Sequence, residues 1–193
     1  MEILDGKKLS EQIKEEIKKA VSFRKENQKK IPHLAAILVG NDGASLTYVG
    51  SKVRSCEQVG FKSTLIRLES NITEEALLSK IRALNNDDTL DGYIVQLPLP
   101  QHINEEKILL AVDANKDVDG FHPSNFGRMA LEMDSFIPAT PFGIMEMLKR
   151  YKIDVSGKHC VVIGRSHIVG RPISILMSQK NNPGNATVTL AHS

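Results

Sequence analysis

A polar amide at the end of a short apolar strand is the first feature of this sequence that could do chemistry. Residues 91–100 (Asp-Gly-Tyr-Ile-Val-Gln-Leu-Pro-Leu-Pro) begin with a turn and a β-type run over 93–95, and Gln96 follows at once. The two prolines then prevent further ladder pairing. Because open α/β sheets bind ligands at the carboxyl ends of their strands, Gln96 could orient a ligand there. The alternative is a strand that stops at a proline turn, with its amide satisfied by the backbone.

An aromatic ring and a lysine share one face of a predicted helix. Tyr48 and Lys52 are spaced i, i+4 within a helix expected over about 43–59, apart from its apolar stripe. A partly desolvated lysine can lose its proton and serve as a base. The alternative is an exposed aromatic–lysine pair. Plausible partners at strand ends, Gln96 and Asp119, favour the chemical interpretation.

A glycine loop follows the predicted strand 159–163. Gly164-Arg-Ser-His-Ile-Val-Gly170 opens a predicted helix, as a dinucleotide loop does, although Ser166 replaces the second glycine of the usual pattern. Amides at a helix N-terminus bind phosphate.

No Asp or Glu follows Asp154, whereas Lys and Arg do, so the acid that would bind an NAD ribose is missing. His192 and Ser193 stand at its expected place, and arginine with serine suits a 2′-phosphate, which predicts NADP. The alternative is an ordinary βα turn with a solvated basic face.

Acids and amides alternate in the stretch 113–120, as in part of a calcium loop. If an EF-hand loop began at Asn115, its twelfth position would fall on Phe126, where a bidentate Glu belongs. We therefore predict no metal site. In the alternative, Asp119 projects a carboxylate into a cleft while Asp117 and Gly120 shape the turn.

The pattern of elements predicts an α/β fold with a parallel sheet built from βαβ units. A new unit is expected near Pro138, which gives domains over 1–137 and 138–193, and the second contains only one βαβ and so looks truncated. The predicted strands are 33–40, 64–68, 93–95, 159–163 and 187–191. The predicted helices are about 8–27, 43–59, one capped by Thr73, one capped by Asn104, one capped by Thr140 with Pro141 in its first turn and ending at about Tyr151, and about 169–180.

Composition excludes several classes of protein. A formal charge of +2 over 193 residues is too weak for a protein whose main partner is nucleic acid. No run is apolar and long enough for a membrane span, and the N-terminus lacks a signal-peptide core. The two cysteines are far apart and suit a reducing compartment, so a cytoplasmic protein is expected.

Five motifs together resemble one family, the bifunctional methylenetetrahydrofolate dehydrogenase/methenyltetrahydrofolate cyclohydrolases. They are Tyr48-Val-Gly-Ser-Lys52, residues 91–100, Lys116-Asp-Val-Asp-Gly-Phe-His122, Pro138-Ala-Thr-Pro141 and Gly164-Arg-Ser-His-Ile-Val-Gly-Arg-Pro172. The resemblance implies an N-terminal catalytic domain, a Rossmann-like NADP-binding domain and a homodimer. It further implies NADP-dependent oxidation of 5,10-methylenetetrahydrofolate and hydrolysis of the methenyl product to 10-formyltetrahydrofolate.

The resemblance also implies roles for individual residues. Lys52 would be the catalytic lysine, supported by Tyr48 and Gln96, and Asp119 would hold the pterin ring of the folate. The other implied contacts are Leu97 and Pro98 with the folate, and Gly164, Arg165, Ser166 and Ser193 with NADP.

The sequence departs from the family pattern at two places. Ala139 stands where the family usually has Cys, and the family's C-terminal glycine-rich motif is absent from these residues. Two rival functions are a monofunctional NADP-dependent dehydrogenase on the same fold and a non-catalytic folate-binding fragment. Lys52 beside Gln96 favours the hydrolytic activity over the first rival.

Overall fold

The computed structural model describes residues 3–193, which pack as two compact units. The first unit comprises Lys7–Asp117, and the second comprises Val118–Ser193 together with the chain up to Gly6. A hydrogen bond from the backbone nitrogen of Asp5 to the hydroxyl of Tyr151 (2.9 Å) joins that N-terminal segment to the second unit.

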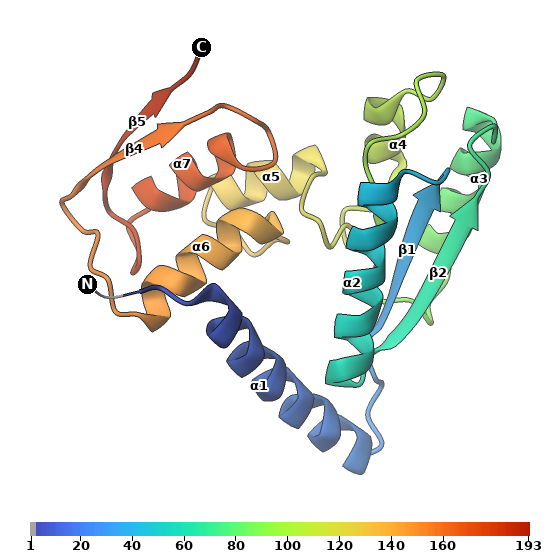
Figure 1. Ribbon diagram of the computed structural model, residues 1–193, viewed down its shortest axis with the longest axis horizontal. Helices are drawn as coiled ribbons and strands as arrows, with labels where there is room; N and C mark the ends of the chain where they lie inside the picture. Colours follow the sequence, from blue (N-terminus) through green and yellow to red (C-terminus); the bar gives the residue numbers. More distant parts are fainter. Residues whose placement is uncertain (1–2) are drawn as a thin grey trace. The chain divides into compact units, whose positions relative to one another are not determined.

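The first unit is built on a parallel sheet with the strand order β2-β1-β3 (Figure 1). Its register pairs His33 of β1 with Lys62 of β2 and Leu34 of β1 with Gly92 of β3. The parallel arrangement predicted from the sequence is therefore confirmed. The elements are α1 (Gly6–Glu26), β1 (His33–Val39), α2 (Gly43–Val59), β2 (Lys62–Leu68), α3 (Glu74–Asn85), β3 (Gly92–Val95) and α4 (Glu105–Ala111).

Helices cover the sheet of the first unit. Helix α2 packs on β1 and β2 and is drawn alongside β1 in Figure 1. Side chains on one face of β1 and β3 form a core with α3 and α4, and the members with no exposed surface are Ile37, Leu77, Ile81 and Ile108. Because strand side chains alternate between faces, the neighbouring Ile94 faces the other way, toward α2 and its buried Val49.

The predicted helix caps of the first unit are confirmed. The hydroxyl of Thr73 accepts a hydrogen bond from Ala76 N (3.2 Å), and the Asn104 side chain accepts one from Lys107 N (3.0 Å). Each bond satisfies a backbone donor that has no partner within its helix.

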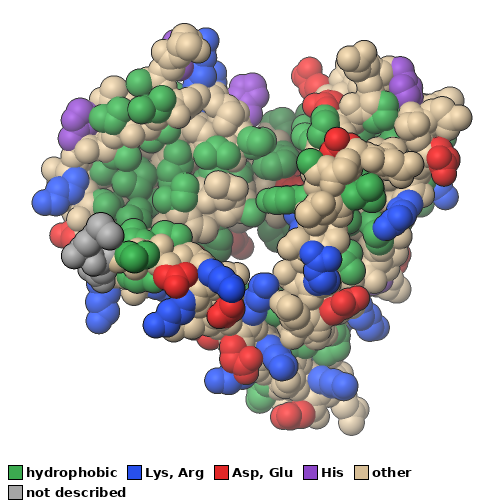
Figure 2. Space-filling view, in the orientation of Figure 1, with side chains coloured by type: hydrophobic (Ala, Val, Ile, Leu, Met, Phe, Trp, Pro, Cys, Tyr) green, Lys and Arg blue, Asp and Glu red, His purple; other side chains and the backbone are tan. Residues whose placement is uncertain are grey.

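The second unit contains a parallel pair of strands joined by a helix, as the sequence predicted. One face of β4 and β5 packs on α7, and the other exposes Val161 and Ile163 of β4. Figure 2 shows hydrophobic side chains over these two strands. The elements are α5 (Pro123–Ala130), α6 (Ala139–Arg150), β4 (His159–Ile163), α7 (Gly170–Ser178) and β5 (Thr187–Ala191).

Two helices in the second unit differ from the expectation. α6 begins at Ala139 with Pro138 at the capping position, so the prediction that Thr140 caps this helix is wrong, and no side chain makes a cap hydrogen bond there. α5 was not predicted, because its cap is unusual: the imidazole Nδ1 of His122 accepts from Ser124 N (3.1 Å).

Packing divides the chain between Asp117 and Val118, whereas the sequence expectation placed the division between 137 and 138. The physical reason is α5, whose Met129 is 2% exposed and joins the same hydrophobic cluster as Met145 and Met177. The chain from Val118 onward thus contributes to the core of the second unit.

Helix α1 carries mostly charged side chains on its surface, which Figure 2 shows as interspersed basic and acidic groups. Only Leu9 and Val21 of this helix are buried. Within residues 3–193, none of the helices combines the length and apolar character that crossing a membrane requires.

We expect Gly120→Ala to destabilise the second unit by about 2 kcal/mol or more, because a side chain is disfavoured in the left-handed region and has no space here. Gly120 has φ +69°, and an added Cβ would lie 2.8 Å from Phe136 O and 2.9 Å from Pro138 N. Urea unfolding followed by circular dichroism measures the change. Gly143→Ala, in the open middle of α6, is the matched control and should be neutral or stabilising by up to about 1 kcal/mol. Equal stability of the two variants would contradict the steric argument.

Candidate functional site

Gln96 continues the hydrogen-bonding of β3 one residue beyond the strand. Its backbone nitrogen donates to Ile37 O of β1 (2.9 Å), so its position is set by the sheet. The chain then passes through a cis peptide bond between Leu97 and Pro98. Leu97 is half-buried and Pro98 is exposed, and the next backbone nitrogen, that of Leu99, donates to the Glu105 carboxylate (2.9 Å). The proline-containing segment after β3 is thus fixed by β1 at Gln96 and by Glu105 at Leu99.

The side-chain amide of Gln96 is only half satisfied. Its Nε2 donates to Leu97 O (2.7 Å), as the backbone-satisfied alternative would have it. Its Oε1 is buried and accepts no hydrogen bond from any residue between 3 and 193. A buried acceptor without a donor costs about 1–3 kcal/mol, so a donor supplied here would be bound favourably.

Tyr48 and Lys52 lie together on α2, as their spacing predicted. The Lys52 Nζ is 5.0 Å from the centre of the Tyr48 ring, a cation–π distance. The Tyr48 side chain is 58% exposed, whereas Val49 on the packed side of the helix is 1% exposed. Lys52 is half-buried and, three residues after Val49 and four before Cys56, lies on the helix face of these buried residues. The prediction that the pair lies apart from the buried stripe therefore holds for Tyr48 only.

The start of α2 is anchored close to the carboxyl edge of the sheet. The Asp42 carboxylate accepts a hydrogen bond from Ser45 N (2.8 Å), and this bond holds the pKa of that carboxyl below its usual value. α2 begins soon after β1 ends and packs on β1 and β2. By alternation from Ile94, Gln96 lies on the α2 face of the sheet. The sheet and this helix thus bring Gln96 to the face from which Lys52 is presented.

The acidic stretch of the first unit is explained by its turn. The Asp113 carboxylate accepts from the backbone nitrogen of Asn115 (2.8 Å) and from its side-chain amide (3.1 Å). Asp117 is 6% exposed and forms a parallel bridge with Tyr93 of β3. These contacts account for the alternation that resembled a calcium loop.

Asp119 directly follows Val118, at which this stretch of the second unit begins, and is half-buried. Across residues 3–193, no group of three or more His, Cys, Asp or Glu side chains is arranged to hold a metal ion.

The glycine loop of the second unit is shaped by a close backbone approach. A Cβ on Gly170 would lie 2.1 Å from Gly164 O, so only glycine allows α7 to begin there. Gly164 itself has φ +116°, and its nitrogen donates to Ala191 O (2.8 Å). The displaced last glycine of the sequence pattern, Gly170, therefore makes a packing contact between loop and helix.

Ser166 has a structural role at the start of α7. Its hydroxyl accepts hydrogen bonds from Val169 N (3.1 Å) and Gly170 N (3.2 Å). Sequence reasoning assigned Ser166 to the cofactor alone and missed this capping function. Two backbone donors that an incoming phosphate would otherwise use are partly occupied by this hydroxyl.

Arg165, His192 and Ser193 meet at the carboxyl edge of β4 and β5. The register pairs Ile163 with Ala191, so the residues that follow leave the sheet side by side. Arg165 Nη1 lies 3.2 Å from His192 Nε2, and His192 Nδ1 lies 2.9 Å from Ser193 O. Because guanidinium only donates, Nε2 accepts and Nδ1 carries the proton. This exposed edge offers a cation, an imidazole and a hydroxyl to an anion.

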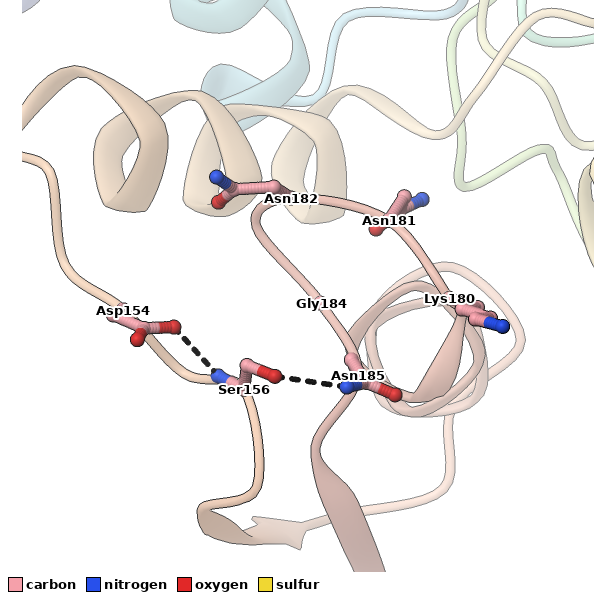
Figure 3. A pocket seen from close by; sticks show the side chains of 7 residues that line it. All are labelled: Asp154, Ser156, Lys180, Asn181, Asn182, Gly184 and Asn185. Carbon is pink, nitrogen blue, oxygen red and sulfur yellow. Dashed lines mark hydrogen bonds between the residues drawn. The ribbon is translucent and has the colours of Figure 1, made fainter.

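A polar pocket of about 280 Å³ lies at the opposite edge of the same two strands (Figure 3). In it the Asp154 carboxylate accepts from Ser156 N (2.9 Å), and the Ser156 hydroxyl accepts from the Asn185 amide (2.8 Å). Both segments precede their strands, whereas the glycine loop follows β4. The pocket is therefore separate from the candidate cofactor edge.

Two family descriptions match this chain. Residues 4–119 match the catalytic domain of tetrahydrofolate dehydrogenase/cyclohydrolase, and residues 138–193 match its NAD(P)-binding domain. The bifunctional protein FolD of Flavobacterium johnsoniae is 70% identical over 193 residues, which are 100% of this chain and 65% of that protein. The chain thus spans less than two thirds of the length of this relative.

Solved structures agree with both units. The bifunctional FolD methylenetetrahydrofolate dehydrogenase/cyclohydrolase of Campylobacter jejuni superposes with a TM-score of 0.93 at 48% identity, covering 100% of this chain and 67% of that one. The Trypanosoma brucei enzyme, solved with NADP cofactor and inhibitor, has a TM-score of 0.89 at 32% identity, covering 97% of this chain and 63% of that one. The chain belongs to the tetrahydrofolate dehydrogenase/cyclohydrolase family.

Proposed function

We propose that the protein oxidises 5,10-methylenetetrahydrofolate with NADP and hydrolyses the methenyl product to 10-formyltetrahydrofolate. The observation that carries the proposal is the buried Gln96 Oε1, for which residues 3–193 supply no donor. Strand alternation places this amide on the face of the sheet that α2, the helix of Lys52, covers. The family membership supplies the substrate class and the cofactor class.

For the oxidation, the protein has mainly to position the folate against the cofactor. Loss of hydride from the carbon that bridges two folate nitrogens leaves a cation stabilised by a nitrogen lone pair, and NADP is the group that accepts the hydride. No protein nucleophile is required, so the contribution of the chain is to orient the folate. Tyr48, exposed on α2, and the rigid exit at Leu97 and Pro98 are the surfaces that we assign to this task.

The hydrolysis needs a base. Water adds to the methenyl carbon and loses a proton. The bond from this carbon to one of the two folate nitrogens then breaks, the hydroxyl proton is lost as the released nitrogen takes up a proton, and the formyl group stays on the other nitrogen. Lys52 in its neutral form would take the proton. Gln96 Oε1 would accept a hydrogen bond from Lys52 or from the water, and being uncharged it orients the lysine without holding it as a cation.

The second unit would hold the cofactor at the edge where Arg165 meets His192 and Ser193. A 2′-phosphate accepts charge-assisted hydrogen bonds from guanidinium, and no acidic side chain after Asp154 opposes it. The open glycine loop at Gly164 leaves room for the pyrophosphate beside the start of α7.

Two further properties belong to the proposal. The family resemblance supports a homodimer, which sedimentation equilibrium can test. Both cysteines are free, Cys56 in the core and Cys160 half-buried, which supports a reducing cytoplasmic location.

Replacing Lys52 by methionine should separate the two activities. The variant keeps much of the aliphatic stem but loses the amine, so hydrolysis should fall by about 10²–10⁴-fold, the usual effect of a lost general base. Oxidation should fall less, and the methenyl intermediate should accumulate. The assay follows methenyl absorbance and NADPH in a chimera that adds to this chain the part of the Flavobacterium johnsoniae relative beyond the matched region.

Lys80→Met, on the exposed surface of α3, is the matched control and should leave both activities unchanged. Equal loss of the two activities in Lys52→Met would restrict Lys52 to substrate binding. Loss of oxidation alone, or normal hydrolysis, would remove it from the hydrolytic step. A wild-type chimera that oxidises but never hydrolyses would support the monofunctional alternative.

We expect Arg165→Ala to weaken NADP binding by about 1.5–3 kcal/mol, the value of a hydrogen bond to a charged group, while NAD binding barely changes. Isothermal titration of this chain with each nucleotide measures both affinities. Arg171→Ala removes a neighbouring exposed guanidinium, which donates to Arg165 O (3.3 Å), and is the matched control. If wild-type protein binds NAD more tightly than NADP, the assignment of Arg165 is wrong.

If Asp119 holds the pterin ring, Asp119→Asn should weaken tetrahydrofolate binding by about tenfold or more, because charge-assisted hydrogen bonds become neutral ones. Calcium should bind to neither protein. Asp134→Asn, an exposed change in the same unit, should leave folate affinity unaltered. Micromolar calcium binding that disappears in Asp119→Asn would instead revive the calcium-loop hypothesis.

A further inference from the structure

A half-buried amide at the end of α3, that of Asn85, joins three segments of the first unit. Asn85 Oδ1 accepts from the hydroxyl of Tyr93 (2.6 Å) and from Asp113 N (2.9 Å), and its Nδ2 donates to Ala111 O (2.8 Å). These bonds connect α3, β3 and the end of α4. The Asn85 side chain thus helps to position the backbone of the segment that follows α4.

Lys116 forms a second connection to the same helix end. Its Nζ donates to Leu84 O (2.9 Å) in the last turn of α3 and to Asp87 O (2.7 Å) in the turn that follows this helix. An ammonium is favourable there because the last carbonyls of a helix lack partners and carry partial negative charge. The stretch between Asp113 and Asp117 is thus tied to α3 by a cation as well as by an amide.

Tyr93 completes the arrangement from the sheet. It is 1% exposed, and this burial raises its pKa, so the phenol stays protonated and donates to Asn85. Its backbone nitrogen donates to Lys116 O (2.9 Å), and it forms a parallel bridge with Asp117. The free edge of β3 therefore holds the last two residues of the first unit.

The backbone is constrained again at Gly120, three residues after Asp117. Gly120 lies against the backbone of residues 136–138, where not even a methyl group would fit. Asp119 therefore stands two residues after the bridged Asp117 and one before Gly120. Two residues span at most about 7 Å, so Asp119 lies within that distance of the bridged Asp117.

We propose that Asn85, Tyr93 and Lys116, the Asn85 clamp, are positioning residues that set folate affinity by fixing the turn that carries Asp119. The proposal rests on the proposed role of Asp119 in holding the pterin ring. The clamp residues act through the backbone of the turn and are assigned no contact with substrate.

The test is titration of this chain with tetrahydrofolate under anaerobic conditions. Lys116→Met and Tyr93→Phe should each raise the dissociation constant about three- to tenfold, the scale of one or two lost hydrogen bonds. NADP affinity should stay unchanged in both. Hydrogen exchange of the backbone amides of residues 116–120 should be faster than in the wild type.

Lys30→Met is the matched control. Lys30 Nζ also donates to a carbonyl in the turn after α3, that of Asp88 (2.8 Å), and pairs with Asp91 (2.9 Å), but neither contact reaches the stretch 113–117. This variant should lose comparable stability while keeping wild-type folate affinity and wild-type exchange at residues 116–120.

The outcomes separate the two proposals. If Asp119→Asn weakens folate binding but the clamp variants do so no more than Lys30→Met, the clamp proposal is overturned and the proposed function stands. If the wild-type chain binds no tetrahydrofolate or Asp119→Asn has no effect, the role of Asp119 fails, and with it the claim that the clamp sets folate affinity. Unchanged exchange at residues 116–120 in both clamp variants would show that the clamp does not hold the turn.

Discussion

The hydrogen-bonding of β3 along both of its edges is the constraint on which the first unit depends. On one edge β3 pairs with β1, and this pairing continues to Gln96, whose nitrogen donates to Ile37 O (2.9 Å). On the other edge Tyr93 receives the chain returning through Lys116 and Asp117. A buried strand must satisfy its backbone groups, and doing so here fixes both the amide of the proposed catalytic site and the start of the acidic turn.

In the second unit, strand register positions the groups that we propose bind an anion. An anion requires a cation and open backbone donors, and the parallel register of β4 and β5 delivers Arg165 and His192 to one edge. The close approach of Gly170 to Gly164 lets α7 begin directly beside that edge. The uncharged groups that would orient a folate and the basic groups that would bind a phosphate thus belong to separately packed units.

Local signals explain what the sequence could predict. Strand alternation, glycine stops and the caps at Thr73 and Asn104 act over a few residues, and the sheets and most helices followed from them. Helix α5 was not predicted because histidine is a rare cap. Helix α6 begins before Thr140 because Pro138 occupies the capping position without a side-chain hydrogen bond.

The polar contacts that connect distant segments could not be predicted. The partners of Lys116 are backbone carbonyls about thirty residues earlier, and a carbonyl has no sequence signature. The pairing of Arg165 with His192 likewise depends on how the two strands are aligned. Residue types therefore identified the candidate chemistry, whereas the groups that orient it became visible only in three dimensions.

The order of the strands has a consequence for how the first unit acquires its site during folding. The central strand β1 pairs with a segment beginning at Lys62 and with one beginning at Gly92, and the far edge of β3 is completed by Asp117. These pairings join parts of the chain that are far apart in sequence, and such contacts form slowly. The environment of Gln96 therefore exists only after nearly the whole unit has assembled. A ligand bound there would recognise the assembled unit alone and would shift the folding equilibrium toward it by mass action.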